Sequence, residues 1–169
     1  GISVYDERLH EGLLRNILVK HAFSTSETMV VFVVNGDGLP QGVEIAERLS
    51  AELPELVSVQ VNINKQPGNV LLGNQTKLLW GRDHIVDQLE GLKFKISARS
   101  FYQVNPEQTE TLYKKAREYA GLSGTEEVFD LYCGVGTITL FMAGQAKHVT
   151  GIEIVPDAVR DAEENARLN

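Results

Sequence analysis

One stretch decides how the last third of this 169-residue chain folds: Glu127-Val128-Phe129-Asp130-Leu131-Tyr132-Cys133-Gly134-Val135-Gly136-Thr137. Its first six residues predict a short apolar strand, and the apolar run 138–143 that follows predicts a helix. Between the two, Gly134 and Gly136 carry no side chains, so a ligand can approach the backbone closely while the helix presents unpaired N–H groups to it. This order of strand, glycine turn and helix is typical of a nucleotide-binding or nucleoside-binding unit.

A second strand and helix follow the turn and supply an acid. Residues 148–154 predict a strand that ends near Glu153, and Pro156 opens the next helix. Glu153 lies 19 positions after Gly134, close to the roughly 20-residue spacing at which a carboxylate accepts hydrogen bonds from both ribose hydroxyls of an adenosine. We therefore predict one nucleoside site formed by the glycine turn and this acid.

The residues around the turn also bear on which cofactor it binds. Thr139 stands where the dinucleotide fingerprint has a third glycine, which disfavours NAD. The turn contains no Lys or Arg, so nothing in it would neutralise a phosphate. These two observations favour an adenosine cofactor that carries a sulfonium group and no phosphate. An NAD-dependent oxidoreductase remains an alternative, as does an adenosine-binding or nucleotide-binding module without catalytic activity.

The first part of the chain predicts a small α+β unit. Strands are expected at 13–19, 29–34, 57–63, 78–80, 85–89 and 92–96, with a helix from Pro40 to about Ala51 and a loop over 65–77. The alternation in 57–63 predicts a half-buried strand. Asn105 and Pro106 then open a helix that Gly121 ends, and its expected buried stripe is Leu112, Ala116, Tyr119 and Ala120.

Composition narrows the class of protein. The chain is 43% hydrophobic and 23% charged, which is typical of a globular protein, and no stretch approaches the roughly 18 apolar residues of a membrane helix. No signal peptide is evident, so we expect a cytoplasmic protein without a membrane partner. Cys133 is the single cysteine and the four histidines lack metal-ligand spacing, so no metal site is expected. A formal net charge of -7 argues against nucleic-acid binding through bulk charge.

Three segments, in their order and spacing, resemble the RNA uracil-5-methyltransferases: Ser100-Phe101-Tyr102-Gln103-Val104-Asn105-Pro106, then Asp130 to Thr137, then Gly151-Ile152-Glu153-Ile154-Val155. The resemblance is firm from about Phe94 to the end and looser before it. It implies an α/β fold in two parts: a small α+β central domain over residues 1–96, followed by the first half of a class I (Rossmann-like) S-adenosylmethionine-dependent methyltransferase domain over residues 97–169.

The resemblance also implies roles for individual residues. S-adenosyl-L-methionine would be the cofactor, with Asp130 facing its methionine part, Tyr132 beside the adenosine and Glu153 on the ribose. Gln103 would also bind the cofactor, and Thr137 holds the position after the turn formed by Gly134 and Gly136. The family forms 5-methyluridine in ribosomal or transfer RNA with a cysteine nucleophile and a carboxylate base. Both groups are expected beyond Asn169, so Cys133 is not expected to be the nucleophile.

These implications make the chain a truncated piece of a longer enzyme. No catalytic residue is expected within it, and the piece alone is predicted to be inactive. The family's N-terminal RNA-binding domain is not present either, which would account for the acidic balance. Because a class I sheet has more strands than the two predicted here, we expect an open strand edge and self-association near residues 128–132. A generic class I methyltransferase with another substrate remains a further alternative.

Overall fold

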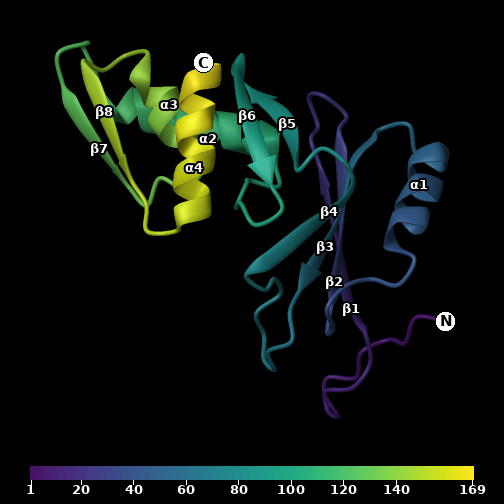
Figure 1. Cartoon of the computed structure of the whole chain (residues 1–169). Coiled ribbons are helices and arrows are strands. Elements are labelled where there is room, and N and C mark those ends of the chain that lie inside the picture. The colour runs from purple at the N-terminus through teal and green to yellow at the C-terminus, as the bar shows by residue number, and fades with distance from the viewer. The chain divides into compact units, whose positions relative to one another are not determined.

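The computed structural model describes all residues, 1–169, and divides into two compact units. The first unit comprises residues 1–22 and 26–85, and the second comprises residues 23–25 and 86–169. The first unit contains one sheet and one helix, and the second contains two small sheets and three helices. Figure 1 shows these elements along the chain. None of the four helices is long and apolar enough to cross a membrane.

The first unit is a four-stranded sheet in the order β1-β2-β3-β4. Its strands are β1 (Leu14–His21), β2 (Thr28–Val34), β3 (Leu56–Ile63) and β4 (Gln75–Gly81). β2 and β3 are parallel and are joined through α1 (Gly42–Glu52), whereas β1 and β4 pair antiparallel at the two edges. The predicted strands and helix of this region are therefore confirmed, with shifted ends.

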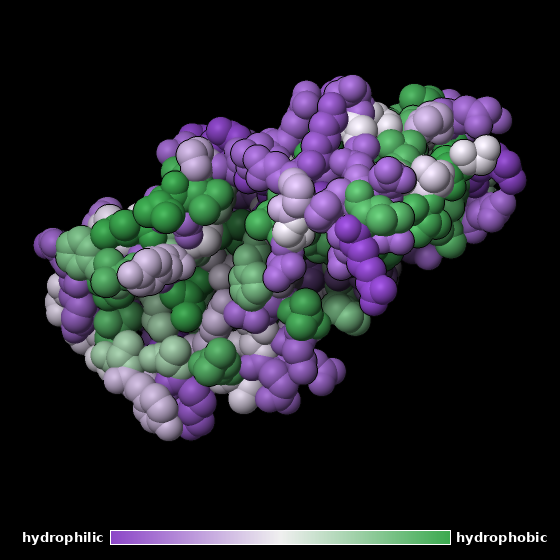
Figure 2. All heavy atoms as spheres, turned by 90° about the horizontal axis from the view of Figure 1, so that it is seen from below, coloured by the Kyte–Doolittle hydropathy of each residue, from purple (hydrophilic) through white to green (hydrophobic).

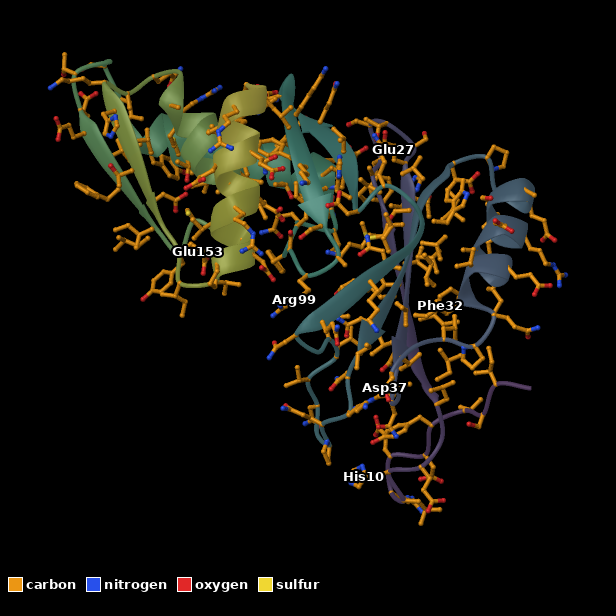
Figure 3. All side chains as sticks on the ribbon, viewed as in Figure 1. His10, Glu27, Phe32, Asp37, Arg99 and Glu153 are labelled. Carbon is orange, nitrogen blue, oxygen red and sulfur yellow. The ribbon has the colours of Figure 1, made fainter.

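The core of the first unit lies between α1 and one face of the sheet. Val30, Phe32 and Val34 of β2 contribute to it together with Val59 and Val61 of β3. Figure 3 labels Phe32 on the side of the sheet that carries α1. Apolar residues in alternate positions of two neighbouring strands thus form one continuous buried surface, as a pleated sheet requires.

The prediction that β3 is only half buried was wrong. Its polar residues Ser58, Gln60 and Asn62 are buried as well. The Gln60 amide donates to the Ser58 hydroxyl at 2.9 Å, and the Asn62 amide donates to the Thr76 hydroxyl at 2.9 Å. Because each buried polar group has a partner, the alternation marks a strand with two covered faces, one of which is polar.

The helix α1 begins at Gly42, two positions later than the predicted start at Pro40. Gln41 adopts a left-handed conformation with φ of 54°, which breaks the helical path between the proline and the helix. A Cβ atom on Gly42 would lie 3.2 Å from Leu79, so the glycine lets the first turn of α1 pack closely on β4.

The second unit contains a hairpin and the parallel strand pair predicted from the glycine turn. The hairpin is β5 (His84–Leu89) and β6 (Leu92–Ser97), joined by Glu90 and Gly91. It is followed by α2 (Pro106–Ala120), β7 (Glu127–Leu131), α3 (Thr137–Ala143), β8 (His148–Ile152) and α4 (Pro156–Leu168). β7 and β8 are parallel and in register from Glu127 opposite His148 to Leu131 opposite Ile152. The predicted first half of a Rossmann-like domain is confirmed.

The ends of α2 were predicted correctly, but its buried face was not. The Asn105 side chain accepts a hydrogen bond from Gln108 N, and Gly121 ends the helix in a left-handed conformation. The buried residues are Thr109 and Tyr113, whereas Leu112 and Tyr119 are 60% and 80% exposed. Tyr113 instead packs its ring against Phe141 of α3, with 5.6 Å between ring centroids. The helix therefore packs on α3 with the side that carries Thr109 and Tyr113, which is more polar than the predicted stripe.

The compact units separate at residue 86, earlier in the chain than the domain boundary we predict near residue 97. The reason is that β6 packs against α4, at the other end of the second unit's sequence. How the domains of the whole protein divide stays a prediction.

Candidate functional site

The glycine turn between β7 and α3 is a tight backbone structure with three left-handed residues. Tyr132, Gly134 and Gly136 have φ values of 73°, 57° and 81°. The N–H groups of Tyr132 and Cys133 both donate to the Ile152 carbonyl, at 2.8 and 2.9 Å, and Gly136 N donates to Cys133 O at 2.9 Å. Two glycines are needed here because side-chain-bearing residues adopt this conformation at a cost.

Glu153 lies directly after β8, in the loop before α4, where Figure 3 labels it. One carboxylate oxygen accepts from Ile154 N at 2.8 Å and Val155 N at 2.9 Å, and the other accepts from Gly134 N at 3.1 Å. The acid and the glycine turn, 19 residues apart, are thus joined by a hydrogen bond. The structure thus contains a direct contact between Glu153 and the glycine turn, which their spacing in the sequence predicts.

The same N–H groups fix the charge of Glu153. Hydrogen bonds from the backbone of Val155, Ile154 and Gly134 stabilise the ionised carboxylate and hold the pKa of Glu153 below its usual value. A carboxylate offers about four lone-pair positions, and three are in use. One position is therefore free for a ligand hydroxyl, and a second hydroxyl would have to displace a backbone N–H.

Asp130, near the end of β7, points to the helix side of the sheet. Its carboxylate accepts a hydrogen bond from the Thr139 hydroxyl at 2.6 Å. Thr139, in the place of the third glycine, therefore orients the acid. Burial, followed by the charges of Asp130 and Glu153, raises the pKa of the Cys133 thiol. Cys133 consequently stays protonated at neutral pH, a poor state for a nucleophile.

Both the backbone conformation and the exposure of Tyr132 are energetically unfavourable in this structure. Its backbone is left-handed, which is uncommon for a residue other than glycine, and its side chain is 87% exposed. Strained, exposed aromatic residues in a turn are typical of ligand contacts. With this exposure, the ring is not part of the core.

Two predicted site residues are not joined to this cluster. Gln103 is half-buried, and its side chain hydrogen bonds to neither the turn nor Glu153. The Thr137 hydroxyl pairs with the Tyr113 hydroxyl of α2 at 2.9 Å. Thr137 thus links α2 to the start of α3. Hydrogen bonds join the turn that contains Tyr132, Gly134 and Gly136 to Ile152 and Glu153, and the charge of Asp130 acts on Cys133 of the same turn.

A cavity of about 280 Å³ lies beside the turn, between α3, β8 and α4. Cys133 and Gly136 of the turn line it together with Glu153, and its other walls are mostly small or apolar. Neither Gly134 nor Tyr132 lines it. The cavity therefore adjoins the turn on the side of Gly136, whereas Gly134 and Tyr132 lie outside it.

The electrostatics of the turn suit a cation more than a phosphate. The charges of Asp130 and Glu153 both act on Cys133 in the turn, and no Lys or Arg forms an ion pair with either acid. No group of His, Cys, Asp or Glu side chains has the geometry to hold a metal ion. An adenosine bearing a positive sulfonium, and no phosphate, matches these charges.

The sequence reasoning missed a set of buried polar residues behind the turn. Asp161 and Asn165 of α4 are buried, as is Ser100 before α2. Asn165 donates to the Val135 carbonyl inside the glycine turn at 2.9 Å. The sequence contains a pattern that could have indicated these residues. Polar residues recur every four positions, at Asp157, Asp161, Asn165 and Asn169, on a helix with a small apolar face.

Strand, glycine turn, helix and acid-tipped parallel strand define part of the Rossmann-like fold of class I methyltransferases. No protein-family profile matches the chain. Over all 169 residues it is 51% identical to an uncharacterized RNA methyltransferase of Halalkalibacterium halodurans and 49% identical to one of Staphylococcus aureus. The chain spans 37% of the length of each of these relatives.

Solved structures agree with these relatives. The tRNA (uracil-54, C5)-methyltransferase of Pyrococcus abyssi, in complex with S-adenosyl-L-homocysteine, matches 99% of this chain and 40% of its own, with a TM-score of 0.79 and 28% identity. The tRNA m1G37 methyltransferase of M. jannaschii matches 96% of this chain and 45% of its own, with a TM-score of 0.51 and 17% identity, and shares the fold alone. The chain is therefore homologous along its full length to a segment of RNA methyltransferases, and the predicted resemblance is confirmed.

Proposed function

We propose that this chain is part of a cytoplasmic, S-adenosylmethionine-dependent RNA methyltransferase that forms 5-methyluridine in ribosomal or transfer RNA. The observation that carries the proposal is the hydrogen bond between Glu153 and Gly134, which places an ionised carboxylate beside a glycine of the turn. The likeness to a tRNA (uracil-54, C5)-methyltransferase supports uracil as the target base.

The residues of the turn fit the cofactor by their chemistry. Glu153 would accept a ribose hydroxyl, and the exposed ring of Tyr132 would stack beside the adenine. A Cβ atom at Gly134 would meet nothing within 4 Å, so there is open space for a ligand against the backbone. Asp130 would attract the cationic end of the cofactor, while Gln103 and Thr137 complete the proposed set. The cofactor, when bound, supplies an electrophilic methyl group.

What this chain contributes is binding and orientation of the methyl donor. The nucleophile and the base that act on the uracil are proposed to lie in other parts of the whole protein, because the pKa of Cys133 is raised and its thiol sits within the turn. The relatives are long enough to carry such parts, since the chain spans 37% of them.

The direct test is methyl transfer to unmodified ribosomal and transfer RNA made in vitro, with the whole protein and with the 169-residue chain. Mass spectrometry of the digested RNA should find 5-methyluridine with the whole protein and none with the chain alone, because the nucleophile and the base are proposed to lie in other parts of the whole protein. A methyl group on another base would favour a generic class I methyltransferase. Calorimetric binding of NAD and not of S-adenosylhomocysteine would remove the cofactor assignment.

We further propose that the 169-residue chain alone self-associates through the small β7–β8 sheet. This sheet has only two strands, and Phe129 and Leu131 on its bare face are 62% and 60% exposed. Figure 2 shows hydrophobic residues gathered on the visible face of the unit that carries these strands. Open edges and apolar faces of this kind pair with available chains.

Light scattering should therefore give at least a dimeric mass that increases with concentration. Phe129→Lys should shift the chain to the monomer because it places a charge on the bare face. Val104→Lys, at another exposed apolar residue of the same unit, is the matched control and should leave the mass unchanged. A monomer at high concentration, before any substitution, would contradict this proposal.

A further inference from the structure

A series of regularly spaced polar contacts joins α4 to β6 and the residues just after it. Each partner on α4 or at its C-cap lies four residues from the next, and each partner on the strand side lies two residues from the next. The pairs are Asp157 with Arg99, Asp161 with Ser97, Asn165 with Lys95 and Asn169 with Lys93. We refer to these four pairs as the α4–β6 ladder.

The spacing of the ladder follows from the geometry of helices and strands. Four residues of an α-helix advance about 6.0 Å and two residues of a strand advance about 6.6 Å, so an antiparallel helix and strand stay in step over several rungs. β6 has β5 as its strand partner on one edge only. The ladder supplies hydrogen bonds on the other edge, where the N–H groups of Lys93 and Lys95 are held by asparagine side chains at 2.8 and 2.6 Å.

Asn165 differs from the other members of the ladder because it also reaches the glycine turn. Its oxygen accepts from Lys95 N at 2.6 Å, and its amide nitrogen donates to Lys95 O at 3.3 Å and to Val135 O at 2.9 Å. The residue is completely buried. One acceptor and two donors are all used, which is a combination that only a carboxamide offers.

A second contact from α4 supports the same turn. A Cβ atom at Gly136 would lie 3.3 Å from the Ala162 Cβ, so the turn rests directly on the helix one turn before Asn165. The turn is thus held from behind by one hydrogen bond and one close packing contact, while its front carries Gly134 and Glu153.

We propose that Asn165 is a positioning residue for the methyl donor: by holding the Val135 carbonyl to β6, it fixes the backbone of the turn on which the cofactor lies. The inference rests on the proposed function, and it adds a residue that touches no ligand. The ladder gives its own control, because Asn169 makes the same paired contact with the backbone of Lys93, at 2.8 Å in both directions, without reaching the turn.

The experiment compares Asn165→Ala and Asn169→Ala in the whole protein. Calorimetry with S-adenosylhomocysteine should give an affinity about tenfold weaker for Asn165→Ala, the change expected for a lost hydrogen bond that holds a binding site in place. Asn169→Ala should stay within about twofold of the wild type. In turnover, Asn165→Ala should raise the KM for the methyl donor and leave kcat at saturation within about twofold, a split that general destabilisation would not give.

Native-state hydrogen exchange on the unmodified protein tests the same link without a variant that could fail to fold. The amides of Gly136 and Lys95 should open with one common free energy, because the turn and β6 are joined through Asn165. Equal effects of the two alanine variants on affinity, or a turn that opens independently of β6, would overturn the inference. A wild-type protein that binds no S-adenosylhomocysteine would instead overturn the proposed function, and the exchange result would still judge the link.

Discussion

Replacement of Glu153 by alanine in the whole protein is expected to weaken S-adenosylhomocysteine binding about 100-fold. The carboxylate is the acceptor proposed for the ribose, and hydrogen bonds to a charged group contribute about 1.5 to 3 kcal/mol each. It also holds Gly134 N at 3.1 Å, so its removal loosens the turn as well. Calorimetry with the wild type and the variant measures the change.

Two further variants separate charge from position. Glu153→Gln keeps an oxygen for Ile154 and Val155 but puts an amide toward Gly134, so it should lose most of the affinity that alanine loses. Glu118→Gln removes an exposed charge that pairs with Lys115 and should leave the affinity unchanged.

Because the pKa of Glu153 lies below its usual value, the carboxylate stays charged and the affinity of the wild type should not fall between pH 8 and pH 5. Full binding by Glu153→Ala would remove this residue from the site.

Alanine at Gly134 and alanine at Gly136 are expected to damage two different properties. Both positions have positive φ, so both substitutions cost about 1 to 3 kcal/mol of backbone strain. At Gly136 the new methyl group also presses on Ala162, so this variant should lose more stability. At Gly134 the methyl group meets no protein atom and instead occupies the proposed ligand space, so this variant should bind S-adenosylhomocysteine about 100-fold more weakly.

Thermal unfolding and calorimetry on the same preparations distinguish the two effects. Gly124→Ala is the matched control for strain, because Gly124 has a φ of 90°, open space around its Cβ position and no part in the site. It should lower stability without changing affinity. If Gly134→Ala binds as well as Gly124→Ala does, the cofactor does not lie on the turn, whatever the melting temperatures are.

Local signals predicted those parts of the fold in which a few neighbouring residues determine the backbone. The glycine turn, the parallel pair β7 and β8, and the ends of α2 at Asn105 and Gly121 all follow from such signals. The buried face of α2 did not, because its partner is Phe141 on α3, and Tyr113 carries both an apolar ring and a hydroxyl that finds Thr137. Which side of a helix is covered depends on a partner distant in the sequence.

The polar residues of β3 illustrate the same limit. Ser58, Gln60 and Asn62 alternate with valines, a pattern typical of a strand with one face in water, yet all three are buried. Gln60 and Asn62 donate to carbonyl groups of Asp83 and Gly73, later in the chain. Asn165 was missed for a related reason, since its importance depends on the meeting of α4, β6 and the turn. At the site, Glu153 and Gly134 could be predicted because a common spacing describes their contact, whereas the orientation of Asp130 by Thr139 had no such rule.

The three backbone N–H groups that already hold Glu153 make ligand recognition at this turn a replacement of partners. Without a nucleoside, the Glu153 carboxylate accepts hydrogen bonds from three backbone N–H groups of its own loop and of the turn. Both the carboxylate and these N–H groups therefore have partners before a ligand binds. One hydroxyl of an incoming ribose would take the free position on the carboxylate, the other would displace one of the amides, and discrimination would come from how well this second hydroxyl reproduces the geometry of the amide it displaces. A 2′-deoxy analogue, with one hydroxyl fewer to offer, would leave the original closure in place.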